Sequence, residues 1–133
     1  MIFPYWEIRL DGEIHWLPLL PVTIHGQDTS IDVLALVDSG SEYSVLGLDL
    51  ADRLEISLAD STPAILVGLG EHEEAGEMIP VEFQVGRHRW TGPAVFSAAA
   101  KQRVILGQTG FFAYFGVAFR YWKREMDIRR GRF

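Results

Sequence analysis

Short runs of β-branched and aromatic residues follow one another along the whole chain and are separated by glycine, proline and aspartate. Valine, isoleucine, threonine and aromatic residues pack well on the pleated surface of a sheet, whereas glycine, proline and aspartate occur where the chain turns. Helical periodicity is rare. The pattern therefore predicts an all-β domain with tight turns. The expected strands are 5–10, 16–24, 30–37, 43–46, 64–69, 78–85, 89–96 and 104–106.

Two hairpin turns and two short helices complete the expected secondary structure. Residues 25–28 predict one turn, and residues 71–76 predict another. Segment 48–54 has apolar residues at helical spacing, and segment 108–115 follows a glycine as a second short helix. The apolar residues of the first helix are Leu48, Ala51 and Leu54.

Length and composition limit the kind of protein that the chain can be. Its 133 residues suit one domain, and the lack of cysteine excludes a disulfide framework or a thiolate metal site. The start of the chain lacks the pattern of a secretion signal, and no segment approaches the roughly 18 apolar residues of a membrane span. We expect one soluble, cytoplasmic domain over residues 1–133, with its core at about 19–122.

Charge is distributed unevenly along the chain. The formal net charge is −6, but residues 120–133 contain six Lys/Arg against two acids. A basic terminus can contact nucleic acid, whereas the acidic remainder of the chain would repel phosphates. We therefore expect residues 123–133 to form a basic tail, either frayed in solvent, in contact with another subunit or paired as a final strand, and we expect no nucleic-acid partner.

The most informative segment is 34–41, an apolar run that ends abruptly in Asp38, Ser39 and Gly40. An apolar strand delivers its next residue to the edge of a buried region, so the Asp38 carboxylate is expected to be partly desolvated. Gly40 permits a sharp turn that brings backbone N–H groups near this carboxylate. The same tripeptide serves as an ordinary turn in many proteins, so taken alone it favours a plain turn over a catalytic site.

The context of this turn adds three further motifs. The run ALVDSGSEYSVL is followed, much later in the chain, by VILGQTGFF. Together they resemble the retropepsin family of single-lobe aspartic proteases. Within this resemblance, residues 65–70 look like the glycine-rich tip of the family's flap hairpin, and residues 79–83 look like the strand after it. The resemblance spans about residues 19–115 and implies a retropepsin-like acid protease barrel.

The resemblance also implies an aspartic endopeptidase that is active as a homodimer on a peptide or protein substrate, without a cofactor. Such hydrolysis needs two carboxylates that share one proton. The chain has one such motif and is too short for two lobes, so a second copy has to supply the second Asp38. The resemblance makes Asp38, Ser39 and Gly40 the catalytic turn, makes Ser41, Glu42, Gly68, Leu69 and Gly70 substrate-binding, and packs Ile105, Leu106 and Gly107 beneath the turn.

Other readings of the chain are weaker. The four histidines, at positions 15, 25, 72 and 88, lack the spacing of a metal site, and no G-x-S-x-G nucleophile motif occurs. The alternative to a peptidase is a retropepsin-shaped binding or assembly module without turnover, because a fold does not by itself establish an activity. Segments 1–18 and 120–133 match no part of the family pattern. Since retropepsins interleave their terminal strands, the mode of dimerisation stays open.

Overall fold

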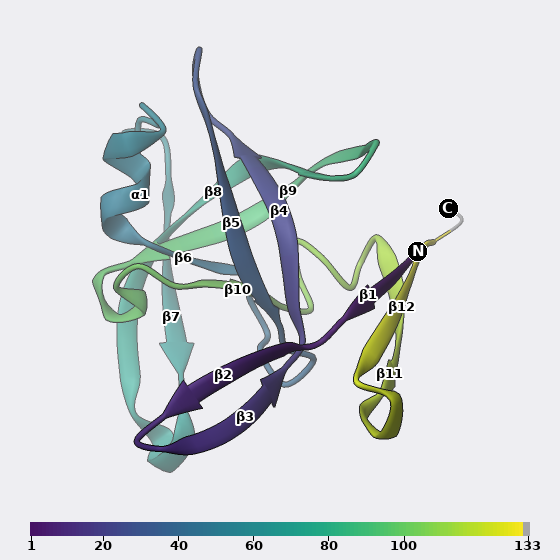
Figure 1. The fold of residues 1–133 in the computed structure, drawn as a ribbon. Coiled ribbons are helices and arrows are strands. Elements are labelled where there is room, and N and C mark those ends of the chain that lie inside the picture. Colours follow the sequence, from purple (N-terminus) through teal and green to yellow (C-terminus); the bar gives the residue numbers. More distant parts are fainter. Residues whose placement is uncertain (132–133) are drawn as a thin grey trace.

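The computed structural model describes residues 1–131, and most of them lie in strands (Figure 1). Seven strands form the main sheet in the order β4-β5-β10-β6-β9-β8-β7. Because β8 also pairs with β4, the strands from β4 to β8 in this order close into a barrel, and β7 lies outside the closed ring. The strands of this sheet are β4 (Leu19–His25), β5 (Ser30–Val37), β6 (Val45–Gly47), β7 (Thr62–Val67), β8 (Glu73–Val85), β9 (His88–Ser97) and β10 (Val104–Leu106). The expected all-β barrel is confirmed.

Alternate residues of the barrel strands fill the core. Leu20, Val22 and Ile24 of β4 are at most 3% exposed, and the residues between them point outward. Side chains of successive strand residues lie on opposite faces of a sheet, so this alternation follows from the strand itself. Phe83 and Trp90 stack in the same interior, with ring centroids 5.4 Å apart. The barrel is therefore a packed core rather than a channel.

Both ends of the described chain form small sheets outside the barrel. One has the order β1-β12-β11, and the other is a hairpin of β2 and β3. Their bounds are β1 (Ile2–Pro4), β2 (Trp6–Leu10), β3 (Glu13–Leu17), β11 (Phe115–Arg120) and β12 (Glu125–Arg130). Tyr5, Met126 and Ile128 are buried in the core, so the core extends beyond the expected range of 19–122. Residues 125–130 are thus a strand and not a solvated tail.

The helical segments differ from the sequence prediction in one respect. The first expected helix is present as α1 (Leu48–Arg53), and three single 3-10 turns, η1 (Leu69–Glu71), η2 (Ala98–Ala100) and η3 (Tyr121–Lys123), accompany it. The prediction of a second helix at 108–115 is wrong. Gly110 has a left-handed φ of +94°, and backbone groups in 107–109 bond to another segment of the chain. No helix of the described residues is long and apolar enough to cross a membrane.

Two predicted turns and one predicted strand can also be compared with the structure. The expected turn at 25–28 joins β4 to β5, where His25 pairs with Ser30. The expected strand 16–24 is two strands, because Pro18 lacks the N–H group needed to continue the ladder. The expected turn at 71–76 lies earlier, around the left-handed Gly70 (φ +73°), and β8 already begins at Glu73. Leu48 of α1 is exposed, unlike the other two apolar residues of its predicted face.

Candidate active site

The Asp-Ser-Gly turn begins where β5 leaves the core. β5 pairs in parallel with β10, with Leu36 opposite Ile105 and Val37 opposite Leu106. The backbone N–H of Asp38 continues this pairing by donating to the carbonyl of Leu106 at 3.0 Å. Leu106 is fully buried, so this bond anchors the Asp38 backbone to the barrel interior, whereas the Asp38 side chain is half-buried. Leu106 and Gly107 are buried beneath the turn as predicted, whereas Ile105 is half-buried and lines the cleft instead of packing only in the core.

Backbone geometry within the turn orients the Asp38 carboxylate. The N–H of Gly40 donates to Oδ1 of Asp38 at 2.9 Å. The N–H of Ser41 donates to the Asp38 carbonyl at 3.2 Å, which closes the turn. An amide that donates to a carboxylate stabilises its ionised form and limits the rotation of its side chain. The sequence prediction that Gly40 brings an N–H group to this carboxylate is confirmed.

The segment after the turn is fastened to residues 107–109. The N–H of Gln108 donates to the carbonyl of Ser41 at 2.8 Å, and the N–H of Thr109 donates to the carbonyl of Glu42 at 2.8 Å. The side-chain amide of Gln108 also donates to the carbonyl of Ser39 at 2.6 Å. A helix at 108–115 would leave these two N–H groups without an intrahelical partner, but it would need the Thr109 carbonyl, which instead accepts from the Ser44 N–H at 3.1 Å. The bonds from Gln108 and Thr109 hold the Asp38 turn on both sides.

Gly107 allows the two segments to approach this closely. A Cβ atom at this position would lie 2.2 Å from the carbonyl oxygen of Tyr43 and 2.6 Å from that of Ser41. Contacts that short with backbone atoms do not occur, so any larger residue would push the segments apart. We call the contact between residues 41–44 and 107–109 the junction, and the Ser44 side chain also joins its two segments. The fully buried hydroxyl of Ser44 accepts from the Gly107 N–H at 3.0 Å and donates to the Thr109 carbonyl at 2.8 Å.

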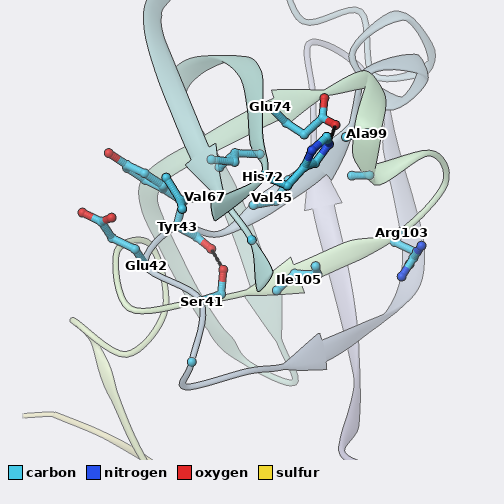
Figure 2. Close-up of a pocket in the computed structure, with 14 residues that line it drawn as sticks. Ser41, Glu42, Tyr43, Val45, Val67, His72, Glu74, Ala99, Arg103 and Ile105 are labelled. Atoms are coloured by element: carbon cyan, nitrogen blue, oxygen red, sulfur yellow. Dashed lines mark hydrogen bonds and ion pairs between the residues drawn. The ribbon is translucent and has the colours of Figure 1, made fainter. Parts of the chain in front are cut away.

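A cleft of about 480 Å³ opens beside the turn (Figure 2). On one side it is lined by residues 40–43, which directly follow Asp38 and Ser39. On the other side it is lined by residues 66–68 of the hairpin formed by β7 and β8. We call this hairpin, with its tip at residues 68–72, the flap. The cleft thus lies between the carboxylate turn and an exposed hairpin.

The sequence-predicted site residues fall into two groups. Gly40, Ser41, Glu42 and Gly68 line the cleft. The other predicted members lie next to the lining rather than in it. Asp38 and Ser39 precede it in the turn, and Leu69 and Gly70 form the exposed tip of the flap. Leu69 is fully exposed, so it makes no packing contact that would hold the tip against the barrel of its own chain.

Sequence reasoning predicted Glu42 but missed three other titratable or charged side chains that line the cleft, His72, Glu74 and Arg103. His72 and Glu74 lie on the flap, with His72 Nε2 2.5 Å from Glu74 Oε1. Arg103 lies on the opposite wall, immediately before β10. Side chains two residues apart in a strand lie on the same face of the sheet. This alternation could have predicted that His72 and Glu74 share one face, and that Arg103 shares a face with Ile105. In the described part of the chain, no three His, Asp or Glu side chains gather as a metal site.

The comparisons with known proteins agree with this geometry. No curated protein matches the chain significantly. A solved retropepsin-like aspartic protease from Rickettsia conorii is similar, with a TM-score of 0.65 and 14% identity over 97% of this chain and 98% of that one. EIAV protease, in complex with the inhibitor HBY-793, has a TM-score of 0.55 and 22% identity over 69% of this chain and 82% of its own. Residues 20–109 match the aspartyl protease family, and this range contains the Asp38 turn, the flap and Gly107. The chain belongs to the aspartyl protease family and has a retropepsin-like fold.

Proposed function

We propose that this protein is an aspartic endopeptidase that is active as a homodimer and hydrolyses peptide bonds with a water molecule held between two Asp38 carboxylates. The observation that supports it best is the Asp-Ser-Gly turn. It is anchored to the buried carbonyl of Leu106, it orients its carboxylate through the Gly40 N–H, and it stands at the mouth of a cleft beneath a flap. The Gly40 bond also occurs in ordinary Asx turns, so the anchor to Leu106 and the position beside the cleft are the features that favour a catalytic turn.

The chemistry explains why a second copy is required. One ionised Asp38 carboxylate takes a proton from the water as its oxygen attacks the carbonyl carbon of the scissile bond. The other Asp38, which holds the shared proton, donates it to the carbonyl oxygen. Collapse of this intermediate breaks the C–N bond, the nitrogen takes a proton, and an acid and an amine are released. The sequence has one Asp-Ser-Gly motif, so two-fold symmetry supplies the partner carboxylate.

The flap supports the choice of an extended peptide as substrate. β7 lies at the edge of the main sheet, so its free backbone groups are available to pair with another strand. Closure of the exposed tip over the cleft would exclude water from the reacting bond. Val45 and Ile105 line the cleft from the barrel, and Leu66 lines it from the flap. These aliphatic side chains favour substrate side chains that place carbon atoms against them.

The experiment measures the solution mass of the protein and the cleavage of a peptide library at mildly acidic and neutral pH, with and without pepstatin. We expect a dimer whose cleavage is lost in Asp38→Asn and is blocked by pepstatin. Asp60→Asn is the matched control, because Asp60 is an exposed aspartate in a turn away from the cleft. A fully active monomer would contradict the proposed chemistry. A dimer that cleaves no peptide would favour the binding or assembly module instead.

A further inference from the structure

Two charged side chains at opposite sides of the cleft have no ionic partner among residues 1–131. Glu42 lies on the side of the Asp38 turn, and Arg103 lies on the far wall (Figure 2). Neither side chain takes part in a hydrogen bond or ion pair within the described chain, whereas the Glu74 carboxylate on the flap is bonded to His72. The guanidinium of Arg103 is therefore the cleft-lining cation that is free to bind a ligand.

The backbone of Arg103 is held firmly although its side chain is exposed. Its N–H donates to the carbonyl of Ala100 at 2.9 Å, and its carbonyl accepts from the N–H of Gly47 at 3.1 Å. Gly47 has no room for a side chain, because a Cβ atom there would lie 1.4 Å from the carbonyl oxygen of Lys101. The loop 98–103 is thus clamped against β6. A fixed backbone reduces the entropy that Arg103 loses when it binds a ligand.

The wall around Arg103 is small and apolar. Ala99 and Ala100 line the cleft on the same loop, and Val45 and Ile105 line it from β6 and β10. Alanine side chains leave space that a larger substrate side chain can fill. An aliphatic stem packs well against such a wall, while its charged end reaches the rim. A wall of this composition that ends in a guanidinium matches a side chain with methylene groups and a terminal carboxylate.

We propose that Arg103 is a specificity-determining residue that selects an acidic side chain, best a glutamate, in the peptide substrate. This inference rests on the proposed peptidase function. The guanidinium offers paired N–H donors whose geometry matches a carboxylate, and bonds between two charged groups are among the strongest hydrogen bonds. When the substrate and the flap exclude water from the cleft, an apolar side chain leaves Arg103 without a partner, and a lysine repels it. In the symmetric dimer each half supplies one Arg103, so glutamate is favoured on both sides of the cleaved bond.

The test compares cleavage of matched peptides that differ at one position, scanned on each side of the cleaved bond through Glu, Gln and Lys. We expect one position on each side at which Glu exceeds Gln in kcat/KM by about tenfold. In Arg103→Glu the order should reverse, with Lys preferred to Glu at the same position. Arg103→Lys should keep the preference for Glu in weakened form, because lysine retains the charge without the paired donors.

Lys101→Glu is the matched control, since Lys101 is an exposed cation on the same loop that does not line the cleft. It makes the same change in net charge and should leave the Glu/Gln ratio unchanged. A ratio near one at every position of the unmodified protein overturns the inference, as does a ratio that Lys101→Glu shifts as much as Arg103→Glu. Cleavage without charge preference refutes only the role of Arg103. Absence of any cleavage sensitive to Asp38→Asn refutes the proposed function, and the role of Arg103 with it.

Discussion

The hydroxyl of Ser44 links the Asp38 turn to the segment beneath it, and Ser44→Ala tests how much that link contributes to stability. The hydroxyl is fully buried, accepts from the Gly107 N–H and donates to the Thr109 carbonyl. In the variant, the buried N–H of Gly107 loses this acceptor, at a cost of about 1–3 kcal/mol. The Thr109 carbonyl keeps its bond from the Ser44 N–H at 3.1 Å, so its loss is only about 1 kcal/mol. We expect the free energy of unfolding to fall by about 2–4 kcal/mol.

The assay is urea unfolding followed by tryptophan fluorescence at one fixed protomer concentration, because the proposed dimerisation would make stability depend on concentration. With a slope of about 2 kcal/mol/M, the loss moves the midpoint by about 1–2 M. Ser57→Ala is the control. Its hydroxyl is exposed and accepts one long bond from the Ala59 N–H at 3.3 Å, so its loss should stay below about 0.5 kcal/mol. Equal losses in the two variants would refute the assignment of Ser44 as the link.

Two further predictions concern the same junction and the terminal sheet. Gly107→Ala should lower the unfolding midpoint in the same assay by at least as much as Ser44→Ala, because its Cβ would collide with the Tyr43 carbonyl; an unchanged midpoint would contradict the packing. Burial disfavours the ionised Asp127 carboxylate, but hydrogen bonds and charge from Arg129 and the Met1 ammonium outweigh burial and hold its pKa below the ordinary value. Asp127 therefore adds stability above a pH of about 4 and loses that contribution as the pH falls through its lowered folded-state pKa. Asp127→Asn should be less stable than the unmodified protein at pH 7, and thermal melts should show the difference narrowing below a pH of about 4; a constant difference would count against it.

Local patterns predicted the elements that depend on short stretches of sequence. Residues 30–37 and 104–106 are strands with the expected bounds, because residues 33–37 and 104–106 are unbroken apolar runs and both strands lie inside the sheet. Helix α1 likewise begins at the expected residue. The pattern failed at 108–115, where the apolar spacing suits a helix. There the Thr109 carbonyl, which a helix would need, accepts from the distant Ser44 N–H, and Gly110 has a left-handed φ. Tertiary contacts of this kind override local propensity.

The sequence by itself determined the family, the barrel strands and the carboxylate turn, since each is carried by a contiguous motif whose chemistry can be read residue by residue. Only the tertiary structure decided which side chains share the cleft. Strands β5 and β10 pair in parallel, so Arg103, which precedes β10, and Glu42, which follows β5, lie at opposite ends of the pair and on opposite walls of the cleft. The bond from Ser44 to Thr109 joins residues 65 positions apart. Such contacts depend on how strands pair across the barrel, and no local periodicity records that pairing.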